Sequence, residues 1–178
     1  RVGNYAGVTV ERRPGKLRLE DGGESLTVEV VDVPGCYSLS ARSAEEQIAI
    51  NAVLGLGGNP RPSLAVVVVD AGQLIRNLYL VLQLIELEVP LVVALNMIDE
   101  VEDDPPSPEA IERLFGVPVV ATSARHGVGV PELKRCLAES LRHPPRGGAA
   151  VAYPPALEGD AQGLIPMLPA EWRSTPGR

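Results

Sequence analysis

The chain has 178 residues, which suits one domain of ordinary size followed by a tail. Hydrophobic residues make up 45% of it and aromatic residues only 3%, so a packed core must be built from Val, Leu, Ile and Ala. The net charge of -7 and the lack of a Lys/Arg block argue against a nucleic-acid-binding face.

Cysteine usage and apolar runs narrow the class of protein further. Cys36 and Cys136 form no CxxC pair and no secretory signal is seen, which predicts free thiols in a reducing cytosol. The apolar runs at 64–69 and 89–95 are far shorter than the roughly 18 residues that cross a bilayer. We therefore expect this segment itself to be soluble.

The first part of the chain predicts a β-hairpin followed by a helix. Residues 16–20 and 26–31 alternate or run apolar on either side of an Asp-Gly-Gly turn. The Asp-Val-Pro-Gly sequence at 32–35 ends the second strand. Residues 43–54 have helical periodicity, which the glycines and prolines of 55–62 interrupt.

Three apolar runs then alternate with three helical patterns. Strands are expected at residues 64–69, 90–95 and 117–121. Helices are expected at residues 74–88, 108–115 and 131–141. The first run is typical of a strand covered on both faces, and Ser107 is the expected N-cap of the middle helix. The order predicts a three-layer α/β fold with a mostly parallel sheet and one antiparallel hairpin. Ligands of such sheets bind at the carboxyl ends of the strands.

Polar residues follow the predicted strands. Asp32, with the turn glycine Gly35, can hold a Mg²⁺-bound water and bring a backbone N–H to a terminal phosphate, although Asp-x-Pro-Gly is also a common turn. Asn96 and Asp99 can read guanine, because a carboxylate only accepts hydrogen bonds and guanine offers a ring N–H beside an exocyclic amine. The alternative for this pair is an Asn/Asp loop cap.

Two further segments are weak signals in isolation. Thr122, Ser123 and Ala124 place small residues where backbone could approach a base edge, or they form an ordinary strand-to-helix loop. Thr9 in a Gly-Val-Thr tripeptide could reach Mg²⁺ with its hydroxyl and a γ-phosphate with its backbone. In chain order, the four signals resemble the second to fifth G motifs of P-loop GTPases over residues 1–141.

The resemblance narrows to one family, the G domain of bacterial ferrous iron transport protein B (FeoB). Most GTPases carry Asn-Lys-x-Asp, whereas Met97 replaces the Lys here. The stretches similar to that family are RVGNYAGVTVE (1–11), DVPGCYSL (32–39), RNLYL (76–80) and ALNMID (94–99). Residues 153–158 resemble the entry to the family's helical regulatory domain. The expected domains are therefore 1–143, the G domain, and 144–178, a Pro/Gly-rich linker with the start of the helical domain.

The resemblance implies a role for each motif. Thr9 and Gly35 would be catalytic through the γ-phosphate, and Thr9 and Asp32 would hold Mg²⁺, Asp32 through water. Met97 would cover the guanine ring. The residues implied to contact GTP are Gly7, Val8, Thr9, Val10, Glu11, Asp32, Val33, Pro34, Gly35, Asn96, Met97, Ile98, Asp99, Thr122, Ser123 and Ala124.

The resemblance also implies an activity and a place. GTP or GDP and Mg²⁺ are the implied cofactors, and the intact protein would hydrolyse GTP to regulate Fe(II) uptake. The implied partners are guanine nucleotide, the transmembrane iron-permease part of the same protein and further copies in an oligomer, with no nucleic acid. The implied location is the cytoplasmic face of the bacterial inner membrane, within a multi-pass protein.

Two departures from the GTPase pattern limit the expected activity. Cys36 stands where Ras-like proteins place a water-orienting Gln, so hydrolysis is expected to be slow. No G-x-x-x-x-G-K-[ST] motif occurs, since Gly15-Lys16 is followed by Leu17. We therefore expect a truncated chain without the first strand, P-loop and first helix, which binds GTP weakly and whose status as an enzyme is open.

No iron site is visible, because His126 and His143 are isolated and the acidic run at 99–104 reads as a solvated loop. Two other functions stay open: a non-hydrolysing interaction module on a GTPase scaffold, and a GTPase of another branch. Met97 and the 1–11 block argue against the second.

Overall fold

A computed structural model describes residues 14–21, 24–40, 43–101, 106–148 and 154–167. The hairpin is formed by β1 (Pro14–Asp21) and β2 (Glu24–Val31), which pair antiparallel from Pro14 opposite Val31 to Asp21 opposite Glu24. The predicted hairpin is thus confirmed, and β2 ends directly before Asp32. Within the described residues the hairpin makes a sheet of its own, separate from the parallel sheet.

The parallel sheet has the order β3-β4-β5. Its strands are β3 (Ala65–Asp70), β4 (Leu91–Asn96) and β5 (Val119–Ala121). The register places Asp70 opposite Asn96 and Leu95 opposite Ala121, so the carboxyl ends of the strands lie together. The residues from Leu91 to Leu95 are all buried, which makes β4 the centre of the core.

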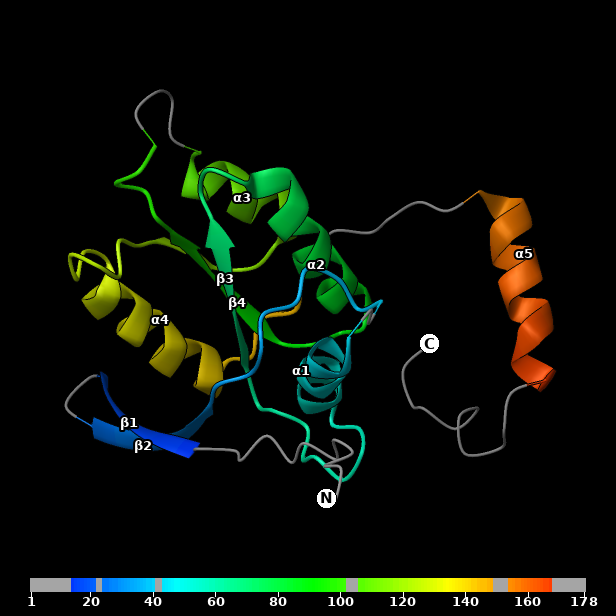
Figure 1. Cartoon of the computed structure of the whole chain (residues 1–178), viewed down its shortest axis with the longest axis horizontal. Coiled ribbons are helices and arrows are strands. Elements are labelled where there is room, and N and C mark those ends of the chain that lie inside the picture. Colours follow the sequence, from blue (N-terminus) through cyan, green and yellow to red (C-terminus); the bar gives the residue numbers. More distant parts are fainter. Residues whose placement is uncertain (1–13, 22–23, 41–42, 102–105, 149–153, 168–178) are drawn as a thin grey trace, which may run out of the picture.

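Helices cover both faces of this sheet, as predicted (Figure 1). On one side α2 (Leu74–Glu86) packs on β3 and β4, and α3 (Pro108–Phe115) packs on β5. On the other side α4 (Val130–Arg142) packs on β4, β5 and the hairpin strand β1. The apolar side chains of α2 that enter the core are Leu80, Val81, Leu84 and Ile85.

Local capping explains where two helices begin. The Ser43 hydroxyl accepts a hydrogen bond from the Glu46 N–H at 3.1 Å before α1 (Ala44–Leu54). The Ser107 hydroxyl accepts one from the Ala110 N–H at 3.2 Å before α3. Each bond satisfies a backbone donor that the first helical turn leaves without a partner.

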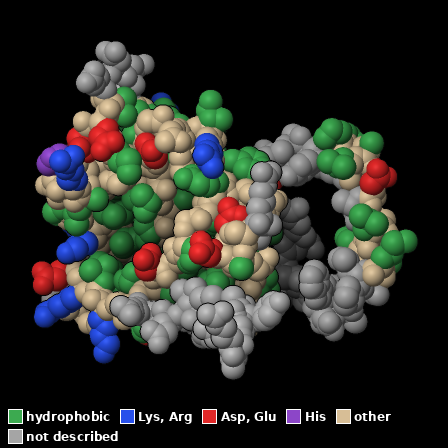
Figure 2. Space-filling view, in the orientation of Figure 1, with side chains coloured by type: hydrophobic (Ala, Val, Ile, Leu, Met, Phe, Trp, Pro, Cys, Tyr) green, Lys and Arg blue, Asp and Glu red, His purple; other side chains and the backbone are tan. Residues whose placement is uncertain are grey.

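One prediction about burial is wrong. The side chains of β3 alternate, with Val67 and Val69 buried but Val66 and Val68 exposed by 44% and 61%. The reason is that α2 covers one face of β3, while α4 on the other face lies over β4, β5 and β1. Figure 2 shows hydrophobic side chains gathered in the hollow between α4 and β3.

The described part of the tail contains a helix. Residues 155–164 form α5 (Pro155–Leu164), which continues into a 3₁₀ turn, η1 (Ile165–Met167). Figure 1 shows α5 apart from the main body. Across the described segments, helices that are both long enough and apolar enough to cross a membrane do not occur.

Candidate functional site

The site is built where β4 ends, at Asn96. Its backbone carbonyl accepts a hydrogen bond from the Ala71 N–H at 2.9 Å, which ties the ends of β3 and β4 together. Its side-chain Oδ1 accepts from the Ala124 N–H at 3.0 Å and from the Thr122 hydroxyl at 3.2 Å. Because Oδ1 is occupied twice, the amide is held in one orientation and its Nδ2 is the side available as a donor.

The loop after β5 begins with two buried residues and is tightly bonded. Thr122 and Ser123 are exposed by only 3% and 2%. The Thr122 N–H donates to the Leu95 carbonyl at 2.7 Å, and Ser123 exchanges backbone bonds of 3.0 and 3.1 Å with Val128. Ala124, which follows this rigid base, is exposed.

A strained turn connects Asn96 to Asp99. Met97 adopts a φ of +62°, which residues other than glycine rarely do, and its side chain is 38% exposed. The next residue, Ile98, is half-buried and packs against the core. Met97 is thereby presented outward at the edge of the site while Ile98 anchors the turn, and such strain is common at ligand sites.

The Asp99 carboxylate lies among three groups of the β5–α4 loop. Its Oδ2 is 3.3 Å from His126 Nδ1, and its side chain is 26% exposed. A hydrogen bond from the Ser123 side chain, followed by the Asp99 backbone N–H and the charges of His126 and Arg125, holds the pKa of Asp99 below its usual value despite partial burial. The carboxylate is therefore ionised at neutral pH and limited to accepting hydrogen bonds.

The Asp32–Gly35 segment follows β2 and stands apart from this cluster in the hydrogen-bond network of the described residues. Asp32 and Gly35 are exposed, whereas Val33 and Pro34 are half-buried. A Cβ placed on Gly35 would meet nothing within 4 Å, so the backbone there is open to an approaching group.

Residues 36–39 are pinned to α2 by contacts that the sequence did not reveal. Cys36 packs against the core, and burial, with a smaller effect of Glu46, raises the pKa of its thiol. The Leu39 N–H donates to Gln83 Oε1 at 2.9 Å. The Arg76 guanidinium carbon lies 3.8 Å from the centre of the Tyr37 ring, a cation–π contact.

Another residue that the sequence reasoning missed is Asp70. Its Oδ1 accepts from the Gly72 N–H at 2.8 Å and its Oδ2 from Gln73 Nε2 at 3.3 Å. These bonds close the turn between β3 and α2. An Asp at the end of an apolar run, directly before Ala-Gly, was the available signal for such a turn.

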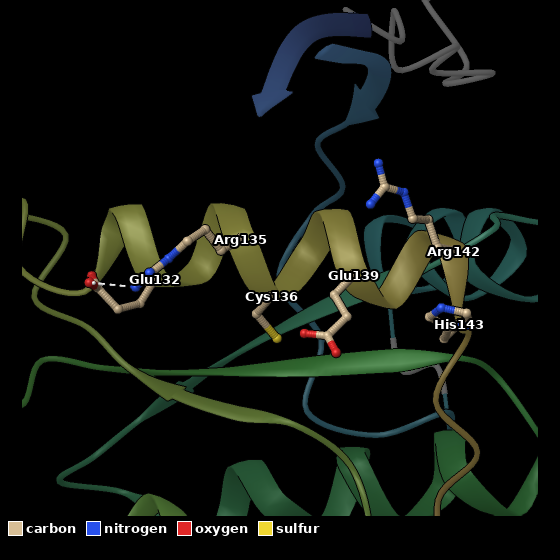
Figure 3. Close-up of a pocket in the computed structure, with 6 residues that line it drawn as sticks. All are labelled: Glu132, Arg135, Cys136, Glu139, Arg142 and His143. Atoms are coloured by element: carbon tan, nitrogen blue, oxygen red, sulfur yellow. Dashed lines mark hydrogen bonds and ion pairs between the residues drawn. The ribbon is translucent and has the colours of Figure 1, made fainter. Parts of the chain in front are cut away.

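The remaining predicted residues, Gly7, Val8, Thr9, Val10 and Glu11, lie outside the described residues. A depression also runs along α4, away from the Asn96 cluster (Figure 3). Cys136 and Glu139 point from the helix toward the strand beneath it, and Arg135 pairs with Glu132 at 3.1 Å. Clusters of three or more residues that could hold a metal ion are absent from the described ranges.

Comparison with known proteins identifies the family. Residues 1–137 match the family model described as ferrous iron transport protein B. The chain belongs to this FeoB family. The Fe(2+) transporter FeoB of Escherichia coli (strain K12) is 39% identical over 177 residues, which are 96% of this chain and 22% of that transporter. The chain thus spans about a fifth of the length of that relative.

Solved FeoB structures match the fold. The FeoB G domain from Methanococcus jannaschii has 38% identity and a TM-score of 0.60, covering 75% of this chain and 81% of that one. The cytosolic domain of T. maritima FeoB has 29% identity and covers 93% of this chain and 63% of that one. Its GDP form II gives a TM-score of 0.75 and its GMPPNP form 0.73. The α/β fold with a parallel sheet and an antiparallel hairpin is therefore that of FeoB G domains.

Proposed function

We propose that these residues form the guanine-nucleotide-binding switch domain of a ferrous iron transporter. In the complete protein the domain would bind and hydrolyse GTP to regulate Fe(II) uptake. The observation that carries the proposal is the set of contacts at the end of β4. Asn96 accepts hydrogen bonds from Thr122 and Ala124 of the loop after β5, and His126 of the same loop lies against the ionised carboxylate of Asp99. The GDP and GMPPNP forms of the T. maritima relative support it.

Base recognition would rest on Asp99. Its carboxylate offers two acceptors to the guanine N1–H and 2-amino group, whereas adenine would leave it without those donors, at a large cost. Asn96 would present its free Nδ2 to the base, and exposed Ala124, whose N–H is held by Asn96 Oδ1, would lie at a base edge. Met97 would cover the ring, with Ile98, Thr122 and Ser123 supporting the pocket.

Phosphate and Mg²⁺ would be held on the other side of the nucleotide by Asp32, Val33, Pro34 and Gly35, together with residues 7–11. A single exposed carboxylate fits Mg²⁺, which is commonly bound through one or two carboxylates, waters and substrate phosphates. Asp32 would hold a Mg²⁺ water, Thr9 would offer its hydroxyl, and the Gly35 N–H would donate to the γ-phosphate. The bound ion would neutralise charge on the β- and γ-phosphates.

Hydrolysis would be slow. Cys36 occupies the position after Gly35, packs against the core and has a raised thiol pKa, so it is a weak donor rather than a water-orienting amide. Thr9 and Gly35 would contribute to hydrolysis by contacting the γ-phosphate.

The parallel sheet would be completed by a further strand beside β3. Within the described residues β3 pairs only with β4, and its outer face exposes Val66 and Val68. An apolar cavity of ≈ 250 Å³ between β2, α1, β3 and α4 adjoins this face. A strand, P-loop and helix placed here would cover the free edge and supply the phosphate-binding amides.

The proposed division is a G domain over 1–143 and, over 144–178, a linker with the start of a helical regulatory domain. The partners would be guanine nucleotide, the membrane permease part of the same protein and further copies of it. The proposed place is the cytoplasmic face of the bacterial inner membrane.

Substitution of Asp99 by Asn tests the function in the complete gene product. An amide offers one donor and one acceptor, which match the N1–H and C2 carbonyl of xanthine rather than the two donors of guanine. Asp99→Asn should therefore lose affinity for GDP and gain it for xanthosine diphosphate, measured by calorimetry. Wild-type protein that binds GDP no better than ADP would refute the proposal and favour an interaction module instead.

A further inference from the structure

His126 lies against the residues that carry base recognition. Its Nδ1 is 3.3 Å from Asp99 Oδ2 and 3.0 Å from Ser123 Oγ. The backbone N–H of His126 donates to the Ser123 carbonyl at 3.1 Å, so the His126 side chain projects from a tight turn. The imidazole is 55% exposed, with Asp99 and Ser123 along one edge.

The neighbours of Nδ1 require a proton on that nitrogen, whether or not Nε2 also carries one. An ionised carboxylate can only accept a hydrogen bond, so a bare Nδ1 lone pair facing Asp99 would be repelled. Nδ1 is therefore the N–H, shared between Asp99 and the oxygen of Ser123. The Ser123 hydroxyl then keeps its own proton for Asp99, in agreement with the lowered pKa of that carboxyl.

We propose that His126 is a positioning residue that holds the Asp99 carboxylate in place and so sets the preference of the site for guanine over hypoxanthine. The inference deepens the proposed function and rests on it. Guanine and hypoxanthine both offer an N1–H, but only guanine adds a 2-amino donor. Both carboxylate oxygens must therefore be aligned for guanine, whereas one suffices for hypoxanthine.

Positioning is needed because Asp99 lies within the turn that the Glu100 N–H closes on the Met97 carbonyl, rather than in a regular element. Buried Ser123 restrains the carboxylate from the β5 side, and His126 restrains it from the solvent side. Arg125 adds charge but no hydrogen bond to Asp99 among the described contacts. Without His126, the carboxylate could rotate toward solvent and present one oxygen instead of two.

The size of the effect follows from the loss of the one contact between Nδ1 and the Asp99 carboxylate. A net contribution of this kind corresponds to about a two- to tenfold change in affinity. His126→Ala should weaken GDP binding by about that factor and weaken inosine diphosphate binding less, so that the ratio of the two dissociation constants narrows. His126→Asn should restore the ratio, because the Asn amide nitrogen takes the place of Nδ1. His126→Gln should not, because its amide takes the place of Nε2.

The experiment compares these three variants in the complete gene product by competition with a fluorescent GDP analogue. His143→Ala is the matched control, since His143 is exposed at the far end of α4. We expect the ratio of the inosine diphosphate and GDP dissociation constants to narrow in His126→Ala and His126→Gln and to return to the wild-type value in His126→Asn. If His126→Ala fails to fold, the difference in this ratio between His126→Asn and His126→Gln decides. An unchanged ratio in His126→Ala and His126→Gln, or equal narrowing of the ratio in His126→Asn and His126→Gln, overturns the positioning role while leaving guanine binding intact. Wild-type protein without any preference for GDP over inosine diphosphate or ADP overturns the proposed function, and the inference with it.

Discussion

Replacing Gly129 by Ala should destabilise the fold directly beneath the base-binding loop. Gly129 is the N-cap of α4 and has a φ of +72°, in the left-handed region. A Cβ placed on it would lie 2.0 Å from the Ala121 carbonyl oxygen and 3.2 Å from the Thr122 Cα. Backbone is on the other side of this contact, so no flexible side chain can move aside.

The loss in free energy of unfolding has two parts, the cost of left-handed backbone and the cost of the close contact, and the same substitution at Gly127 separates them. Left-handed backbone costs a residue with a Cβ about 1–2 kcal/mol. Forcing β5 and α4 apart adds about 1–3 kcal/mol, the usual range for overpacking. Gly127 has nearly the same φ, +71°, but a Cβ there would meet nothing within 4 Å. Gly127→Ala should therefore show the first cost alone, and Gly129→Ala the sum, about 2–5 kcal/mol.

Urea unfolding of the two purified variants, followed by circular dichroism, measures both values on one scale. Gly129→Ala should unfold at a clearly lower urea concentration than Gly127→Ala and should bind guanine nucleotide more weakly, because the displaced backbone carries Thr122. Equal midpoints for the two variants would refute the close approach of α4 to β5 on which this reasoning depends.

Three further substitutions test the site and the helix caps. Asn96→Ala removes the acceptor of a loop N–H and of the buried Thr122 hydroxyl, and should lower the free energy of unfolding by about 1–3 kcal/mol in urea, whereas Asn96→Asp keeps the acceptors and should lose less. Ser123→Ala removes the largest cause of the lowered Asp99 pKa, so carboxyl-carbon NMR should show that pKa moving up toward its usual value. A carboxyl whose pKa is lowered in the folded state stabilises the fold above its unfolded pKa, and this stabilisation is lost as the pH falls through its folded pKa. The difference in free energy of unfolding between wild type and Ser123→Ala should therefore shrink in acid. A difference that stays constant with pH would contradict this role of Ser123. Ser107→Ala should cost about 1 kcal/mol in thermal or urea unfolding, with Ser107→Asp close to wild type; equal losses in both variants would argue against capping.

Local signals in the sequence determined most of the elements. Strand β2 ends where Asp-Val-Pro-Gly begins, and α3 has the predicted bounds because Ser107 caps its start. The continuous apolar run at 90–95 predicted a strand, and β4 is a strand that is buried from Leu91 to Leu95. Periodicity, caps and breakers act within a few residues, so they can be read without knowing the fold.

The same kind of run was misleading for β3. Leu64–Val69 looks like the β4 run in composition, yet alternate valines of β3 are exposed, because burial depends on which helix lies over which strand. The sequence likewise gave no reason to connect Gln83 with Leu39. These features depend on contacts between distant segments.

The candidate site shows the same division. The order and spacing of Asn96, Asp99 and Ser123 predicted a base-reading cluster at strand ends, and parallel pairing of β4 with β5 brings these residues together. From the sequence alone, His126 was interpreted as isolated from any site residue. Only the tertiary structure places its Nδ1 between Asp99 and Ser123, because the turn after β5 folds back on the turn after β4, and no local pattern encodes that contact.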